Sequence, residues 1–246
     1  MGQPAPKRVL LIVSGGIAAY KSLELVRLLR RRDIGVAAVL TEGGAQFVTP
    51  LSLQALTAEK VYTALWSLTD ESEMGHIQLS RSADLVVVAP ASANMLAKMA
   101  SGLADDLAST VLLATDKPVL AAPAMNVRMW IHPATVANLA LLQSRGVRIV
   151  GPDEGAMACG EFGPGRLAEP PVILEAIPGL LNPAPQPLAE IGEDRIRRLF
   201  PGVDGGEQHL IVELEVLPQR GHVAGRHLGE AGRQRGETRP LAHLMD

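Results

Sequence analysis

The sequence predicts an α/β protein with an open, doubly wound parallel sheet of the Rossmann-like or flavodoxin-like kind, followed by an irregular C-terminal tail. Three continuous apolar runs, at 9–13, 36–40 and 85–89, are typical of strands buried on both faces of a parallel sheet. Helix-like stretches separate these runs, and glycine or small polar residues follow each of them. This alternation indicates one α/β domain.

The first half of the chain contains two predicted strand and helix pairs. The strand at 9–13 is followed by a helix at 20–32, whose apolar face comes from leucine and valine. Arg30, Arg31 and Arg32 lie in its last turn, where cations complement the helix dipole. The strand at 36–40 precedes a short helix at 50–58, for which Thr49 is the expected N-cap.

The second half continues the alternation. Asp105 and Asp106 are expected to cap a helix rather than to act as a catalytic pair, because adjacent side chains point apart. Periodicity fails between 61 and 75, where an acidic surface loop is expected. The remaining elements are a strand at 85–89, helices at 95–100 and 107–114, strands at 119–122 and 147–150, and helices at 133–145 and 170–181.

The composition argues against a nucleic-acid-binding protein and against a membrane protein. A net charge of -3, with only two tryptophans, two tyrosines and three phenylalanines, offers little for binding nucleic acid. No stretch approaches the roughly 18 consecutive apolar residues of a membrane span, and the first eight residues do not resemble a signal peptide. We therefore expect a soluble, cytoplasmic protein that binds no membrane and no nucleic acid.

The end of the chain has a different composition. Residues 182–187 alternate proline with small or polar residues, as in an extended linker. Residues 207–246 are rich in Gly, Arg, His and Glu. We expect residues 1–181 to form the functional domain, and residues 182–246 to be a linker and tail without a second catalytic domain.

The segment Ser14-Gly15-Gly16-Ile17-Ala18, between the first strand and its helix, is a candidate phosphate site. Its glycines let backbone N–H groups approach an anion at a helix N-terminus, and Lys21 adds a positive charge. The segment lacks both G-x-G-x-x-G spacing and the Gly-Lys-Ser/Thr of a P-loop, which favours a mononucleotide. The alternative is a tight strand-to-helix turn without a ligand.

Three further loops leave the carboxyl ends of predicted strands, where open α/β sheets bind ligands. Thr41 could bond a phosphate or ribityl hydroxyl, and Phe47 either covers a ring or packs in the core. Ser92-Ala93-Asn94 offers small residues and two hydrogen-bonding side chains. Asn126 follows the fourth strand amid Met125, Met129 and Trp130, which suit a planar cofactor beside a small acid or simply pack on the core.

His76 and Cys159 are the candidates for proton chemistry. His76 lies at a predicted helix start beside the acidic loop, where a histidine titrates near neutrality, although a lone histidine is usually structural. Cys159 is the only cysteine and lies within a glycine-dense segment, 155–169, expected to form a mobile flap. No metal site is predicted.

Together these motifs make residues 7–181 similar to the flavin-dependent cysteine decarboxylases, in particular those acting on phosphopantothenoylcysteine in coenzyme A biosynthesis. Met95 departs from the pattern, since the family usually has threonine there. The motifs are Gly15-Gly16-Ile17-Ala18-Ala19-Tyr20-Lys21, His76, Pro90-Ala91-Ser92-Ala93-Asn94, Pro123-Ala124-Met125-Asn126 with Met129-Trp130, and Gly155-Ala156-Met157-Ala158-Cys159-Gly160 continuing to Gly165-Arg166.

The resemblance implies a homo-oligomer, a trimer or a multiple of trimers, that binds FMN near the subunit interface and converts phosphopantothenoylcysteine to phosphopantetheine. It implies that Asn126 holds the departing carboxylate, His76 handles protons and Cys159 protonates the product. The implied FMN contacts are Ser14, Gly15, Gly16, Ile17, Ala18, Thr41, Phe47, Ser92, Ala93, Asn94 and Met125, and the implied substrate contacts are Asn126, Met129, Met157 and Ala158.

Two other functions share much of this pattern. A peptidyl-cysteine decarboxylase would carry every motif above. A flavin-binding regulatory homologue would have lost the catalytic histidine or cysteine, whereas His76 and Cys159 are both present. Bifunctional members of the family continue into a CTP-dependent synthetase, for which we find no second nucleotide-binding pattern after Pro187.

Overall fold

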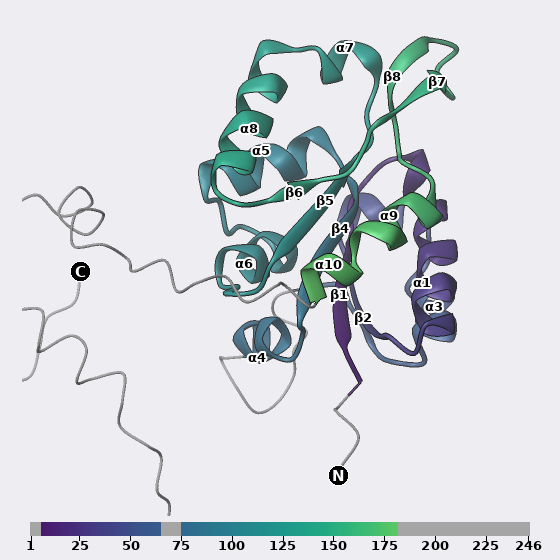
Figure 1. The fold of residues 1–246 in the computed structure, drawn as a ribbon, viewed down its shortest axis with the longest axis vertical. Helices are drawn as coiled ribbons and strands as arrows, with labels where there is room; N and C mark the ends of the chain where they lie inside the picture. Colours follow the sequence, from purple (N-terminus) through teal and green to yellow (C-terminus); the bar gives the residue numbers. More distant parts are fainter. Residues whose placement is uncertain (1–5, 65–74, 182–246) are drawn as a thin grey trace, which may run out of the picture. The chain divides into compact units, whose positions relative to one another are not determined.

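A computed structural model describes residues 6–64 and 75–181, which form an α/β domain (Figure 1). The predicted linker and tail lie outside the described residues. The central sheet is parallel throughout, with strand order β3-β2-β1-β4-β5-β6. Its strands are β1 (Arg8–Val13), β2 (Gly35–Leu40), β3 (Val61–Tyr62), β4 (Leu85–Ala91), β5 (Val119–Pro123) and β6 (Arg148–Ile149). The predicted doubly wound parallel sheet is confirmed.

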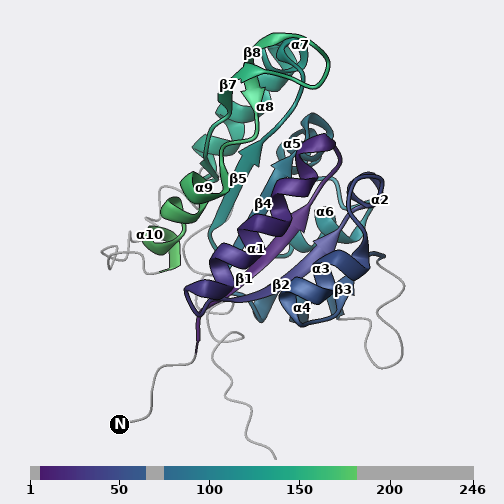
Figure 2. The same ribbon diagram turned by 90° about the vertical axis from the view of Figure 1, so that its right-hand side faces the viewer.

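Helices cover both faces of the sheet (Figures 1 and 2). On one face lie α1 (Lys21–Arg31), α3 (Pro50–Thr57), α9 (Pro170–Ala176) and α10 (Pro178–Leu181). On the other lie α4 (Gly75–Arg81), α5 (Ala93–Ser101), α6 (Leu107–Leu113) and α8 (Pro133–Ser144). Three short helices occupy loops: η1 (Ile17–Tyr20), α2 (Glu42–Ala45) and α7 (Val127–Trp130).

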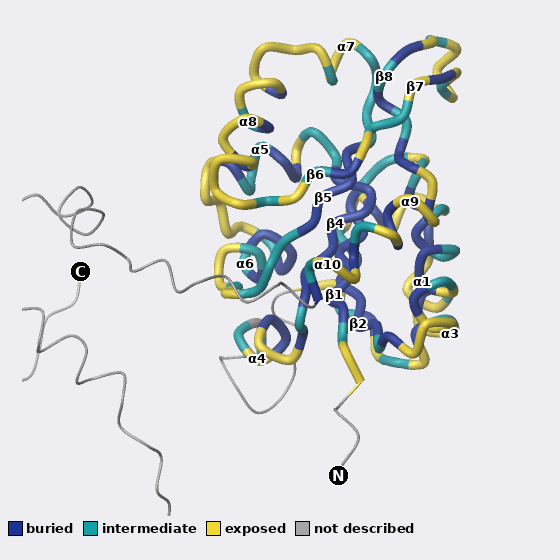
Figure 3. Tube along the Cα trace, viewed as in Figure 1, coloured by how far each residue is buried: buried dark blue, intermediate teal, exposed yellow. Residues whose placement is uncertain are grey.

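The central strand β1 shows why the apolar runs are continuous. Val9, Leu11 and Val13 pack in the layer that contains α1, whereas Leu10 and Ile12 pack in the layer that contains α5. All five side chains are fully buried, as the dark central strands of Figure 3 indicate. A strand covered on both faces has no solvent side, so no alternation with polar residues appears.

Helix caps follow the expected chemistry. Thr49 accepts a hydrogen bond from the backbone N–H of Ser52, as predicted for the N-cap of α3. Asp106 caps α6 in a capping box with Ser109, which confirms the structural interpretation of this aspartate. Gly146 follows α8 with φ near 89°, a conformation that suits glycine.

Several boundaries differ from the sequence-based expectation. The edge strand β3 was not expected, because two residues are too few to show periodicity. The first helix begins with a 3-10 turn, η1, ahead of α1. The predicted helix at 170–181 is two helices, because Pro178 cannot donate the hydrogen bond that would continue α9. The third run extends through Pro90 to Ala91.

The glycine-dense segment forms an antiparallel hairpin of β7 (Asp153–Ala156) and β8 (Phe162–Arg166). Its turn is closed by hydrogen bonds from the N–H of Met157 to the carbonyl of Glu161, 2.8 Å, and from the N–H of Gly160 to the carbonyl of Met157, 2.9 Å. The predicted flap is therefore a hydrogen-bonded hairpin in this structure. Within residues 6–64 and 75–181, no helix is long and apolar enough to cross a bilayer.

Replacing Gly44 with alanine should destabilise the domain by about 1–3 kcal/mol through overpacking. A Cβ at Gly44 would lie 2.5 Å from the carbonyl oxygen of Val13 and 2.8 Å from Leu40 Cδ1. Gly35→Ala is the matched control, because its nearest new contact would be an ordinary 3.6 Å. Denaturant unfolding measures both variants, and equal midpoints for the two would contradict the steric role of Gly44.

Candidate active site

A cavity of about 640 Å³ opens at the carboxyl ends of β1, β2 and β4. Its walls bring together five of the residues predicted to bind a cofactor: Ser14, Gly15, Thr41, Ser92 and Asn94. The other lining residues are Val39, Leu40, Glu42, Gly43, Thr63, Ala64, Met95, Lys98, Asp105, Asp106, Leu107 and Ala108. The loops after three neighbouring strands thus converge, as the strand order predicts.

Ser14 ties the loops after β1 and β4 together. Its hydroxyl donates to the carbonyl of Pro90 at 2.6 Å and accepts from the N–H of Ser92 at 2.9 Å, and its side chain is buried. The hydroxyl proton of Ser14 is used in the hydrogen bond to the Pro90 carbonyl, so it is not available to a ligand. Ser14 therefore shapes the cavity, and its hydroxyl proton does not point to a ligand.

The loops after β1 and β2 touch through glycines. A Cβ on Gly15 would lie 3.2 Å from the carbonyl carbon of Gly43, so a larger residue would push the two loops apart. Thr41 fixes its loop by accepting from the N–H of Gly44 at 3.1 Å and by donating to the carbonyl of Val13 at 3.3 Å. Backbone groups, more than hydroxyls, are thus left to face a ligand here.

Ser92 and Asn94 differ in the hydrogen-bonding groups that they leave available to a ligand. Ser92 accepts from the N–H of Met95 as the N-cap of α5, while its hydroxyl proton has no partner within the described part of the chain. Asn94 is exposed and makes no side-chain hydrogen bond to any other described residue. Its amide can both donate and accept, as the edge of a heteroaromatic ring requires.

Asn126 and Cys159 meet at a second place, where the N-terminus of α7 faces the turn of the β7–β8 hairpin. The Asn126 Nδ2 lies 3.5 Å from Cys159 Sγ, and its Oδ1 accepts from the N–H of Arg128 at 2.7 Å. The same Nδ2 donates to Glu161 Oε2, and that oxygen also accepts from the Cys159 thiol at 3.8 Å. An amide, a thiol and a carboxylate, 35 residues apart at most in sequence, form one cluster, which we call the hairpin-turn cluster.

Glycines seat the β7–β8 hairpin on the loop that carries Asn126. The N–H of Met125 donates to the carbonyl of Gly165 at 2.9 Å, and a Cβ on Gly165 would lie 2.3 Å from the carbonyl oxygen of Met125. A Cβ on Gly163 would contact Val127 at 3.2 Å. Only a glycine-rich strand can approach this closely, which explains the Gly-Pro-Gly pattern of β8.

The family model described as Flavoprotein matches residues 2–182. The chain belongs to the flavoprotein family. It is 50% identical over 171 residues to the coenzyme A biosynthesis bifunctional protein CoaBC of Escherichia coli K12, a match that spans 70% of this chain and 42% of that protein. The flavoprotein thus covers less than half the length of that bifunctional relative.

Two solved structures resemble this flavoprotein along most of their length. One is a cysteine-to-serine variant of a PPC decarboxylase in complex with pantothenoylaminoethenethiol, with a TM-score of 0.63, 36% identity and 97% of that chain covered. The other is the FMN-dependent cysteine decarboxylase SpaF, with a TM-score of 0.63, 31% identity and 96% of that chain covered. These alignments cover 70% and 72% of the flavoprotein.

The remaining predicted residues of the flavoprotein are not among those that line the cavity. Ile17 and Phe47 are exposed and do not line it, nor do Gly16, Ala18, Ala93 and Met125. Met129 and Ala158 are exposed near the hairpin-turn cluster, and Met157 packs against Gly165. His76 lies in the first turn of α4, as expected, but its side chain lies outside the described part of the structure.

The sequence did not single out Glu161 or Lys98, and weak signals for both existed. Glu161 follows the Cys-Gly dipeptide of the hairpin turn, so an acid was adjacent to the candidate thiol. Lys98 lies seven and eight residues before Asp105 and Asp106 in the sequence. Lys21, expected to attract a phosphate, instead pairs with Glu169 at 2.7 Å.

Lys98 forms ion pairs with both acids of the cavity wall, at 2.7 Å to Asp105 and 2.6 Å to Asp106. These hydrogen bonds raise the pKa of Lys98, and the bond from Lys98 lowers the pKa of Asp105. Partial burial acts to raise the pKa of Asp106, but hydrogen bonds from Lys98 and Ser109 outweigh it and lower that pKa. The lysine charge is therefore neutralised within the wall.

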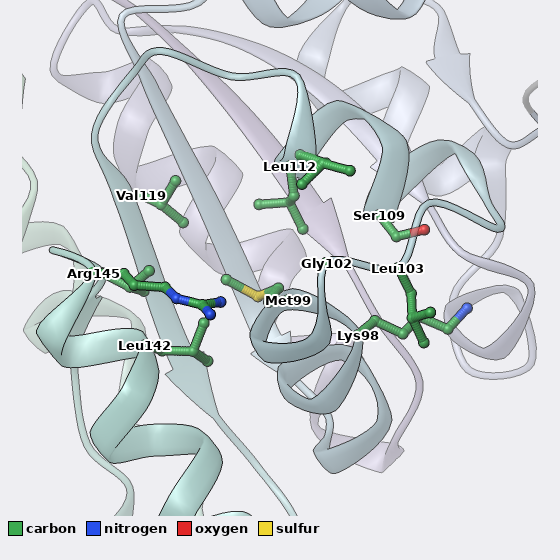
Figure 4. Close-up of a pocket in the computed structure, with 11 residues that line it drawn as sticks. Lys98, Met99, Gly102, Leu103, Ser109, Leu112, Val119, Leu142 and Arg145 are labelled. Carbon is green, nitrogen blue, oxygen red and sulfur yellow. The ribbon is translucent and has the colours of Figure 1, made fainter. Parts of the chain in front are cut away.

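A smaller cavity, about 110 Å³, lies between α5, α6 and α8 (Figure 4). Met99, Leu112, Val119 and Leu142 line it, and Arg145 lies at its side and donates to the carbonyl of Ala100 at 2.7 Å. Its size and its distance from the carboxyl ends of the strands make it a poor site for a mononucleotide. The larger cavity is the better cofactor site.

Asp106→Asn should make the stability of the flavoprotein less sensitive to acid. A lowered pKa in the folded state means that Asp106 stabilises the fold above its unfolded pKa, near 3.8, and loses this contribution as the pH falls through lower values. Asparagine retains the cap but not the charge. The free energy of unfolding between pH 6 and 3, compared with an Asp116→Asn control, measures the effect, and parallel curves for the two variants would refute it.

Proposed function

We propose that residues 1–181 form an FMN-dependent decarboxylase that converts phosphopantothenoylcysteine to phosphopantetheine and carbon dioxide in coenzyme A biosynthesis. The observation that carries the proposal is the hairpin-turn cluster, because it places an amide for a carboxylate beside the chain's only thiol. The relatives named for coenzyme A biosynthesis and for PPC decarboxylase support the choice of substrate. We also propose that the enzyme is cytoplasmic.

The larger cavity fits FMN in volume and in chemistry. Cofactor sites typically measure roughly 300–1,000 Å³, and this cavity has about 640 Å³. Asn94 offers an amide for the ring, and the turn at Gly15 offers backbone N–H groups at the start of a helix for the phosphate. The 31% identical relative SpaF is an FMN-dependent cysteine decarboxylase, which supports this cofactor.

The protein's own part in the reaction is to hold the carboxylate and to move protons. When bound, FMN would supply a reversible two-electron acceptor for the cysteine side chain of the substrate. Asn126 Nδ2 would donate to the substrate carboxylate while carbon dioxide leaves, since negative charge can delocalise onto the oxidised sulfur. His76 would accept and return protons at the start of α4.

Cys159 is the proposed proton donor to the decarboxylated enethiol. Its thiol is exposed in the hairpin turn and lies within 3.5 Å of the amide that would hold the carboxylate. A related PPC decarboxylase in which a cysteine was changed to serine is in complex with pantothenoylaminoethenethiol, an enethiol. That complex supports a role for cysteine after decarboxylation.

We further propose that the active site is completed between subunits of a trimer or a multiple of trimers. The lining of the cavity, among the described residues, includes neither Asn126 nor Cys159. A second copy of the chain is one source of a hairpin-turn cluster at the mouth of each cavity. Exposed apolar residues on α7 and α8, such as Met129 and Val136, favour association.

The FMN-loaded protein should release carbon dioxide from phosphopantothenoylcysteine and not from a peptide that ends in cysteine. The peptide is the main alternative substrate, because a peptidyl-cysteine decarboxylase would share the motifs. Trapping released carbon dioxide from each substrate decides between them. Release from the peptide alone would replace our choice, and release from neither would favour a flavin-binding regulatory protein.

Cys159→Ser should still release carbon dioxide but accumulate the unsaturated enethiol in place of phosphopantetheine. A serine hydroxyl is a far weaker acid than a thiol, so the final protonation would fail. Mass spectrometry separates the two products by two hydrogens. Unchanged formation of saturated product would show that another group donates this proton.

A further inference from the structure

The Asn126 side chain has no hydrogen-bond donor left for a substrate in this structure. Its Oδ1 accepts from the N–H of Arg128 at 2.7 Å, which fixes the direction of the amide. Its Nδ2 has two hydrogens. Two acceptors lie within hydrogen-bond distance of this Nδ2, Glu161 Oε2 and, at 3.5 Å, Cys159 Sγ, and both belong to the hairpin turn.

Glu161 presents to Asn126 the same chemical group that a substrate carboxylate would present. Its Oε2 accepts from both groups that the proposed function assigns to catalysis, the Asn126 amide and the Cys159 thiol. Glu161 is partly buried, and no cation is paired with it among the described residues. A second carboxylate brought to the same amide would meet like charge as well as a filled donor.

We propose that Glu161 is a resident carboxylate that occupies the substrate-carboxylate position on Asn126 and is displaced when substrate binds, an inference that rests on the proposed function. Glu161 is thus a positioning residue. It holds the amide and the thiol together in the free enzyme and exchanges with the carboxylate of the incoming substrate. After carbon dioxide has left, no carboxylate remains to keep Glu161 away, and its return favours release of the product.

The strands of the hairpin are anchored to the Asn126 loop, whereas the tip of its turn is exposed. Gly163 and Gly165 hold β8 against Val127 and Met125, so the strand is anchored beside Asn126. By contrast, Ala158, Cys159 and Gly160 are exposed at the turn. A rotation of the Glu161 side chain, or a shift of this turn, frees Asn126 without unseating the hairpin.

The test compares two ligands on the full-length, FMN-loaded protein by calorimetry. Phosphopantothenoylserine keeps the carboxylate but lacks the thiol, and phosphopantothenoylethanolamine lacks both. Glu161→Gln should bind the first about tenfold more tightly than the wild type, because a neutral amide is a weaker competitor and does not repel a carboxylate. Its affinity for the second should change less than about twofold.

Glu154→Gln is the matched control, since it removes an exposed charge from the same hairpin without touching Asn126. It should leave both affinities unchanged. Retention of FMN absorbance and of far-UV circular dichroism shows that each variant is folded, and Glu161→Asp, with its shorter side chain, should give an intermediate gain if Glu161→Gln does not fold.

The outcomes separate the two proposals. Equal or weaker binding of phosphopantothenoylserine by folded Glu161→Gln or Glu161→Asp, with normal binding by the wild type, overturns the role of Glu161 and leaves the proposed function intact. A tenfold gain for both ligands also overturns it, because the effect would not depend on the carboxylate. A wild type that binds neither ligand overturns the proposed function and this inference with it.

Discussion

The buried hydroxyl of Ser14 holds together the edge of the sheet on which the cavity depends. It joins the loop after β1 to the loop after β4 by hydrogen bonds to the Pro90 carbonyl and the Ser92 N–H. Gly15 and Gly43 bring the loop after β2 against the same point. The cavity wall is thus braced from three strands, and the side chains left free, such as Asn94, project from a rigid edge.

The fold could be predicted from the sequence wherever burial on both faces made a strand uniformly apolar. The runs at 9–13, 36–40 and 85–89 became β1, β2 and β4, and their loops converge as the rule for parallel sheets requires. The edge strand β3 was not predicted, because two residues, Val61 and Tyr62, are too few to show a periodic pattern. The hairpin was not predicted as strands. Its glycines allow close packing on Met125 and Val127, which is a tertiary contact that the local sequence pattern does not reveal.

The sequence predicted least well which polar side chains of the site bind a ligand and which bind other groups of the protein. Ser14 was expected to face a phosphate, and Thr41 a phosphate or a ribityl hydroxyl. Backbone groups of these loops take up hydrogen bonds of both side chains. Lys21 was expected to attract an anion and pairs with Glu169 instead. The sequence identified Asn126 and Cys159 as candidate site residues, but it did not predict that they are in contact. The β7–β8 hairpin brings Cys159 back to Asn126. Glu161 had only a weak local signal, its place directly after Cys159-Gly160, because an acid in a glycine-rich turn usually faces solvent.

The proposed exchange at the hairpin-turn cluster would let a difference of one carboxylate between substrate and product govern binding. The proposed substrate and product differ by one carboxylate, so a site that held both equally would remain occupied by product. A fixed cation would strengthen substrate binding but would need to be desolvated again in every cycle. Glu161 Oε2 accepts from the Asn126 amide in this structure, so this donor is not left unpaired. In the proposed exchange, Glu161 would return to the amide once the substrate carboxylate has left as carbon dioxide. Asparagine suits this exchange because its neutral amide can donate to either carboxylate and carries no net charge of its own.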